Sequence, residues 1–154
     1  MGRFAVLVYG ILSYLLFLLT FLYMIGFLGN VLVPKTIDSG FRSELLPSIL
    51  IDVGWLGLFA LQHTVMARPG FKERWIRIIP AAAERSAFVL VTNLLLILLM
   101  WQWRPLPELV WSVDGIPART LWVAFLAGWG MVLISTFLTD PFDLFGLRQV
   151  RCAI

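Results

Sequence analysis

The chain has 154 residues, of which 60% are hydrophobic and 14% are charged, and its mean hydropathy is +0.91. Soluble domains carry about 25% charged residues, so this composition excludes an ordinary soluble domain and predicts helices that cross a membrane. The net charge of +3 does not indicate nucleic-acid binding, because the basic residues lie between apolar runs, where membrane orientation accounts for them.

Four apolar runs reach about the 18 residues that a membrane-spanning helix needs. The first follows the lone cation Arg3 and exceeds the roughly 7–15 apolar residues of a signal peptide, so a retained span is expected. Pro34, Pro105 and Pro141 follow the first, third and fourth runs, where proline commonly ends a helix. Residues 1–154 are therefore predicted to form one all-α, polytopic membrane domain with short interfacial helices and four spans: Phe4–Val31, Leu46–Met66, Ala87–Trp103 and Leu121–Leu138.

The second run contains the only histidine, His63, and the only acid inside an expected span, Asp52. A charged residue within a span costs about 2.5–3.5 kcal/mol on insertion scales, so such residues are commonly functional or paired. Two interpretations of His63 stay open: a proton acceptor or hydrogen-bond donor in a cytoplasm-facing site, or a residue that ties this helix to a neighbour. Asp52 is expected to be structural, with an amide, a tryptophan N–H or water as its partner. Since Cys152 is remote from His63 along the chain, no metal site is predicted.

The connection after the second run, Pro69–Pro80, mixes apolar side chains with cations. Phe71, Trp75, Ile78 and Ile79 recur at helical spacing, which predicts a short helix lying in the membrane interface with its cations toward lipid phosphates. The alternative is that these cations hold an anionic ligand.

Lysine and arginine are unevenly shared between the two sides that four spans create. Eight lie in the N-terminus, the second connection and the C-terminus: Arg3, Arg68, Lys72, Arg74, Arg77, Arg85, Arg148 and Arg151. Four lie on the other side: Lys35, Arg42, Arg104 and Arg119. Because cytoplasmic segments carry the excess of positive charge, both termini are predicted to face the cytoplasm.

Polar and small residues inside the spans are expected at helix–helix contacts. Polar side chains there form hydrogen bonds between helices worth about 0.6 kcal/mol each; they are Asn93, Gln102, Ser135 and Thr136. Small residues permit close approach of two helices; they are Gly54, Gly57, Ala60, Gly128 and Gly130. Tryptophans around the third connection indicate an aromatic belt at the membrane–water boundary; they are Trp101, Trp103, Trp111 and Trp122.

The segment T-D-P-F-D-L-F-G-L-R-Q-V, Thr139–Val150, is predicted to start a helix, with Asp140 as N-cap and Pro141 in the first helical position. Its portion F-D-L-F-G-L-R-Q-V resembles the central signature of the nurim family, and especially the bacterial branch of methanethiol S-methyltransferases. Three further stretches resemble that family in the same order: Leu61–Arg68 (L-Q-H-T-V-M-A-R), Glu84–Ser86 and Trp101–Pro107. Pro141 departs from the pattern, in which a histidine is expected, and so does the chain after Val150.

The resemblance implies methyl transfer from S-adenosyl-L-methionine to a small thiol, giving dimethyl sulfide from methanethiol. It implies that His63 is the catalytic candidate, and that Gln62, Arg68, Arg148 and Gln149 lie on the substrate side or in the motif. It also implies that the cofactor-binding motifs belong to a C-terminal half, similar to isoprenylcysteine carboxyl methyltransferases, which this chain lacks. The expected location is the bacterial inner membrane, and the expected partners are the lipid bilayer, the thiol and a separately encoded second half.

Two alternatives to a complete enzyme follow from the same observations. The chain is either one half of a split methyltransferase or a non-catalytic integral membrane protein. The second belongs to a different functional class, and binding of S-adenosylmethionine by the purified chain would argue against it.

Overall fold

The computed structural model describes residues 3–108 and 112–138, and within these ranges it is helical, without strands. Its elements are α1 (Arg3–Gly29), α2 (Leu45–Ala67), α3 (Pro69–Trp75), the 3₁₀ turn η1 (Ala81–Ala83), α4 (Glu84–Gln102) and α5 (Gly115–Leu138). The helices α1, α2, α4 and α5 are each long and apolar enough to cross a bilayer. This confirms the predicted all-α class with four spans.

All four long helices begin before the residue predicted, α1 and α2 by one residue and the other two by three or more. α4 begins at Glu84 rather than Ala87, and this acid in the first turn is favoured by the helix dipole. α5 begins at Gly115 rather than Leu121, and Pro117 lies in its first turn, where a missing N–H leaves no intrahelical bond unmade. The predictions followed uninterrupted apolar runs, and polar residues break these runs near both starts: Glu84, Arg85 and Ser86 in α4, and Arg119 and Thr120 in α5.

The interfacial helix α3 is shorter than predicted. It ends at Trp75, so only Phe71 and Trp75 share its apolar face, and their rings stack with centroids 5.5 Å apart. Ile78 and Ile79 lie in the turn that follows, where both backbone N–H groups donate to the Trp75 carbonyl at 3.0 and 3.1 Å. Pro80 disfavours helical geometry in the residue before it, which accounts for the early stop.

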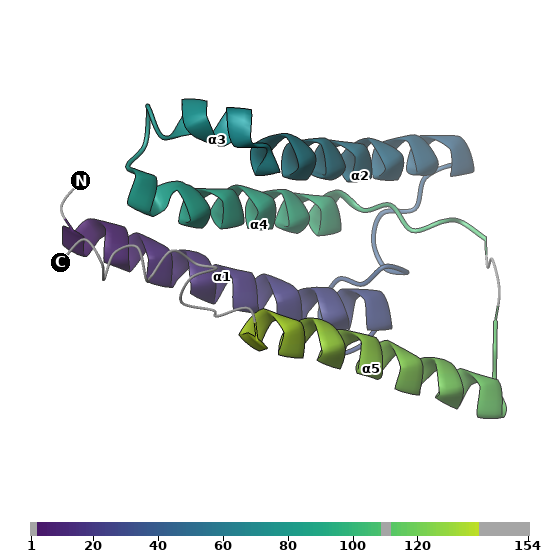
Figure 1. Ribbon diagram of the computed structural model, residues 1–154. Helices are drawn as coiled ribbons and strands as arrows, with labels where there is room; N and C mark the ends of the chain where they lie inside the picture. The colour runs from purple at the N-terminus through teal and green to yellow at the C-terminus, as the bar shows by residue number, and fades with distance from the viewer. Residues whose placement is uncertain (1–2, 109–111, 139–154) are drawn as a thin grey trace.

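The long helices lie side by side in the order α2, α4, α1 and α5 (Figure 1). α4 packs against both α1 and α2. α1 and α4 run in one direction while α2 and α5 run in the other, as consecutive spans require. We call the end with α3 and the start of α4 the His63 end, and the opposite end, where the connections after α1 and α4 meet, the Lys35 end.

The seam between α2 and α4 follows a regular spacing. The less exposed residues of α2 recur three or four positions apart, as in helices packed along a shared stripe; they include Ser48, Asp52, Trp55, Phe59, Gln62 and Met66. At the Lys35 end, Trp55 and Phe59 pack on an apolar cluster of Phe27, Leu99 and Met100.

The seam between α1 and α4 is built from small polar residues seven positions apart. Ser13 and Thr20 of α1 and Ser86 and Asn93 of α4 are each at most 3% exposed. The hydroxyls of Ser13 and Thr20 donate to the carbonyls four residues earlier, both at 2.8 Å, so burial leaves neither hydroxyl unpaired. Small side chains let helix backbones approach closely in a membrane, where helix association depends on packing.

The glycines predicted to permit close helix approach do not do so among the described residues. A Cβ added at Gly54, Gly57, Gly128 or Gly130 meets no described atom within 4 Å. The close approaches lie on α1 instead. A Cβ at Gly26 would lie 2.6 Å from the Val31 carbonyl oxygen, and one at Gly29 would lie 3.3 Å from the Trp122 ring.

Candidate functional site

The His63 side chain bridges α2 and α4. Its ring stacks on Phe59 of the same helix, with centroids 5.7 Å apart and planes at 30°, and meets Phe88 of α4 at 5.1 Å and 50°. His63 is nevertheless an exposed residue. Two aromatic neighbours thus orient an imidazole that remains open to a ligand. This geometry fits both interpretations of His63, since the ring ties two helices together and is accessible.

The Gln62 amide lies beside His63 and faces α4. Its Nε2 donates to Met66 Sδ at 3.0 Å and to Thr92 Oγ1 at 3.4 Å. Its Oε1 is buried and has no hydrogen-bond partner among the described residues. Buried polar atoms are nearly always hydrogen-bonded, so this oxygen can accept a bond from water or a ligand.

The backbone of Arg68 joins α2 to α3. It adopts an extended conformation, and its carbonyl accepts hydrogen bonds from the N–H groups of Phe71 and Lys72, both at 3.1 Å. Its side chain is exposed at the His63 end. Lys72 forms a 4.0 Å ion pair with Glu84, which links α3 to the start of α4. The other two residues predicted on the substrate side, Arg148 and Gln149, lie outside the described residues.

A second polar cluster occupies the Lys35 end. Asp52 is 6% exposed, and its Oδ1 accepts a 2.9 Å hydrogen bond from the Arg104 backbone N–H. Asp52 therefore has the amide partner that was expected of a structural acid. Trp103 Nε1–H donates to the Ile37 carbonyl at 3.1 Å, and Lys35 Nζ donates to the Trp101 carbonyl. These bonds hold the connection after α1 against the end of α4.

Lys35 experiences competing electrostatic effects in this cluster. Burial and the nearby Arg104 guanidinium both lower the pKa of the Lys35 ammonium, and the Asp52 carboxylate opposes them in part. Arg104 itself lies over the Phe41 ring, 4.7 Å from its centroid, in a cation–π contact. Within this cluster, two cations therefore lie close to one carboxylate.

Comparisons with known proteins identify the family. No protein-family model matches the sequence, and no solved structure matches it. A methanethiol S-methyltransferase of Crocosphaera subtropica is 49% identical over 151 residues, which are 97% of this chain and 59% of that protein. A methanethiol S-methyltransferase of Mycobacterium tuberculosis is 46% identical over 154 residues, which are 99% of this chain and 63% of that protein. Nurim of Xenopus laevis is 32% identical over 127 residues, which are 77% of this chain and 44% of that protein.

The chain belongs to the nurim family, on its methanethiol S-methyltransferase branch. The resemblance predicted from its motifs is thereby confirmed. This nurim-family chain spans 59% and 63% of the length of the two bacterial relatives described.

Around His63, the rings of Phe59 and Phe88 and the Gln62 amide form one wall. Two hollows lie along α1 instead, one of about 680 Å³ beside α5 and one of about 380 Å³ beside α4, and His63 lines neither.

Two contacts of this wall were not predicted from the sequence. Phe59 precedes His63 by four residues, so their contact follows from helical spacing and could have been predicted. Phe88 and Thr92 reach His63 and Gln62 from α4, and only the packing of the two helices reveals this.

Proposed function

We propose that this chain forms the thiol-binding part of a membrane methyltransferase that converts methanethiol to dimethyl sulfide. The observation that carries the proposal is its 49% and 46% identity, over nearly the whole chain, to two relatives named methanethiol S-methyltransferase. The membrane setting supports it as well, because a small apolar thiol partitions into lipid. S-adenosylmethionine is the proposed methyl donor, with its site in the part of the relatives that these 154 residues do not cover.

The proposed role of His63 is to accept the proton of the thiol. Methylation replaces an S–H bond by an S–CH₃ bond, and the thiolate is the nucleophile, while a free thiol has a pKa of about 8.5. A neutral imidazole nitrogen within hydrogen-bond reach of the sulfur would take that proton. The accessible ring between Phe59 and Phe88 supports this role, and the unpartnered Gln62 Oε1 supports a hydrogen bond to the thiol or to water beside it.

The proposed location is the inner membrane of a bacterium, with both termini in the cytoplasm. The lysine and arginine distribution supports this orientation, which opens the His63 end toward the cytoplasm. Arg68 would then lie on the cytoplasmic side, where the water-soluble S-adenosylmethionine arrives, with Arg148 and Gln149 in the proposed substrate-side motif.

The alternative is that the chain is non-catalytic by itself, either as one half of a split enzyme or as an integral membrane protein without activity. The open wall that the described residues form around His63 favours this alternative. A separately encoded second half would restore activity in the first case and not in the second.

The deciding experiment measures dimethyl sulfide in the headspace over purified protein supplied with methanethiol and S-adenosylmethionine. The chain is tested alone and together with the polypeptide encoded directly downstream. Activity only with the second polypeptide supports the split enzyme, and no activity in either case contradicts the proposed function. In an active preparation, His63→Ala and His63→Gln should reduce turnover by about 10²–10⁴-fold, while the exposed neighbour Thr64→Ala should not. Undiminished turnover in both histidine variants would remove His63 from catalysis.

A further inference from the structure

An apolar groove runs between α1 and α4 and ends at Lys35. It has a volume of about 380 Å³, and its walls include Leu16 and Leu19 of α1 and Ile97 and Met100 of α4. Leu19 is 65% exposed, so the groove opens away from the bundle, toward the membrane. From Leu16 to Tyr23 it follows α1 for about 10 Å, at 1.5 Å per residue. That length suits part of an extended hydrocarbon chain.

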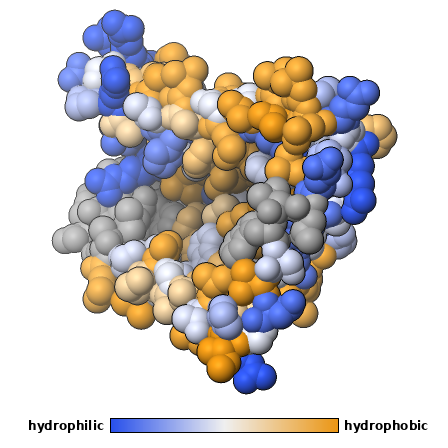
Figure 2. Space-filling model, turned by 90° about the vertical axis from the view of Figure 1, so that its right-hand side faces the viewer, coloured by the Kyte–Doolittle hydropathy of each residue, from blue (hydrophilic) through white to orange (hydrophobic). Residues whose placement is uncertain are grey.

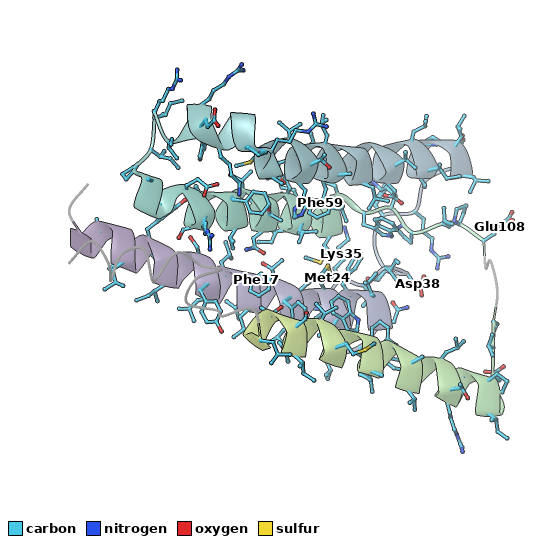
Figure 3. The ribbon with its side chains drawn as sticks, viewed as in Figure 1. Phe17, Met24, Lys35, Asp38, Phe59 and Glu108 are labelled. Atoms are coloured by element: carbon cyan, nitrogen blue, oxygen red, sulfur yellow. The ribbon has the colours of Figure 1, made fainter. Side chains whose placement is uncertain are left out.

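The groove ends in a cation with hydrogen-bond donors to spare. Of the described residues that line it, Lys35 is the one charged group, and Figure 3 shows Lys35 lying between α1 and α4. An ammonium has three N–H donors, and the Trp101 carbonyl accepts one of them. The Tyr23 hydroxyl donates to the Lys35 carbonyl at 3.3 Å, which holds the backbone of this residue beside the groove.

Lys35 also lies at the depth of lipid head groups. α1 ends at Gly29 and α4 at Gln102, and the indoles of Trp101 and Trp103 mark the same level. Tryptophans gather at the membrane–water boundary. Figure 2 faces this end, where hydrophilic side chains lie around hydrophobic ones. An amphiphile seated here would place its head at Lys35 and its tail in the groove.

The charges that act on Lys35 favour an anionic head. The groups that shift the pKa of its ammonium are Arg104 and Asp52; Asp52 already accepts a hydrogen bond from the Arg104 backbone, and Asp38, in the same connection as Lys35, accepts one from Asn30. Arg104 repels the Lys35 ammonium, and the single carboxylate offsets this only in part. Burial and Arg104 lower the pKa of Lys35, and a negative charge beside the ammonium would oppose this lowering by stabilising the charged form.

We propose that this groove binds an anionic phospholipid, with the phosphate on Lys35 and an acyl chain between α1 and α4. The proposal is independent of methyl transfer. It predicts selectivity for the charge of the head group, which an unspecific apolar surface in contact with lipid would not have.

The test is lipid binding by the full chain, purified in a neutral detergent and freed of lipid, with native mass spectrometry as the readout. Phosphatidylglycerol is compared with phosphatidylcholine of the same acyl chains and with inorganic phosphate. We expect phosphatidylglycerol to bind more tightly than phosphatidylcholine. The Lys35→Gln substitution should weaken phosphatidylglycerol binding about fivefold, as the loss of one interfacial cation implies. The matched control is Lys72→Gln, the only other lysine of the chain, which lies outside the groove and should weaken phosphatidylglycerol binding less than Lys35→Gln does.

Two further variants test the head-group contact and the acyl-chain groove separately. They also keep the proposal testable if the Lys35→Gln variant does not fold. Lys35→Arg keeps the charge and should retain selectivity. Leu19→Trp fills the groove at an exposed position, so it should weaken phosphatidylglycerol binding although Lys35 is intact. Equal binding of the two lipids, or equal loss in the Lys35→Gln and Lys72→Gln variants, would overturn the proposal. Binding of inorganic phosphate as tight as that of phosphatidylglycerol would also overturn it, because it would identify a simple anion site.

Discussion

The carboxylate of Asp52 accepts a 2.9 Å hydrogen bond from the backbone N–H of Arg104. This bond joins the first third of α2 to the residue that follows the α4 C-cap, and Asp52 is 6% exposed. A buried acid is thereby paired with a backbone donor at the membrane boundary, where α4 ends and water begins.

Replacing Asp52 by alanine should destabilise the protein. A hydrogen bond to a charged group contributes about 1.5–3 kcal/mol, and the buried Arg104 N–H would lose its acceptor. Asp52→Asn retains an oxygen that can accept the bond and should cost less. Thermal unfolding in detergent checks both, with exposed Glu44→Gln as the control. A melting temperature of Asp52→Ala equal to that of the wild type would refute this account.

A second prediction concerns the packing of α1 on α4. Ser13 is 1% exposed and donates to the Tyr9 carbonyl of its own helix. Ser13→Ala should therefore change stability little, whereas Ser13→Leu forces extra volume into the seam and should cost about 1–3 kcal/mol. Leu12→Ala, at a 60% exposed neighbouring position, is the control for changes on α1. If Ser13→Leu proved as stable as Ser13→Ala in thermal unfolding, the seam would not be tightly packed.

The sequence predicts the spans well because helix length and apolar content are local properties. The starts at Glu84 and Gly115 were missed because polar residues, Glu84–Ser86 in α4 and Arg119 and Thr120 in α5, interrupt the apolar runs near the helix starts. For Asp52 the expected kind of partner was correct, since a buried carboxylate requires a donor wherever it lies.

What the sequence does not predict is the rotation of each helix about its axis. Small residues such as Gly54 and Gly57 are typical of a helix-packing face, yet no described atom lies within 4 Å of a Cβ added at either. The buried small residues are instead Ser13 and Thr20 of α1. Which face is buried depends on contacts with other helices. For the same reason Phe88, the α4 neighbour of His63, could not be predicted.

The predicted orientation can be tested with cysteines, because the chain has only one of its own, Cys152. In a Cys152→Ser background, cysteines are introduced at Glu108, after α4, and at Glu73, in α3; both positions are exposed. A membrane-impermeant maleimide should label the Glu108→Cys variant in intact cells and the Glu73→Cys variant only after permeabilisation. The reverse pattern would place the His63 end outside the cytoplasm.

A pH prediction follows from Lys35. Its pKa in the folded state lies below the ordinary value of 10.5, so between these two values the unfolded chain binds more protons than the folded one. The contribution of Lys35 to stability therefore rises with pH across this window. The melting temperature of the wild type minus that of Lys35→Gln should increase as pH rises toward 10.5. A difference that falls over the same range would contradict the lowered pKa.

The last prediction separates a structural from a functional role of Gln62. Its two hydrogen bonds are weak, a 3.0 Å bond to the Met66 sulfur and a 3.4 Å bond to Thr92. Gln62→Leu removes these two bonds, but it also removes the cost of burying Oε1 without a partner. The two effects should nearly cancel, so the free energy of unfolding should change little.

If Oε1 instead binds the thiol or its water, Gln62→Leu should reduce methyl transfer in an active preparation by about tenfold or more, the effect of about 1.4 kcal/mol. Thr92→Val is the matched control, because it removes one partner of Gln62 from α4 and leaves Oε1 in place. Unchanged turnover in Gln62→Leu would make the amide a structural element. A melting temperature that falls in step with turnover would lead to the same conclusion, since the amide would then act by holding α2 against α4.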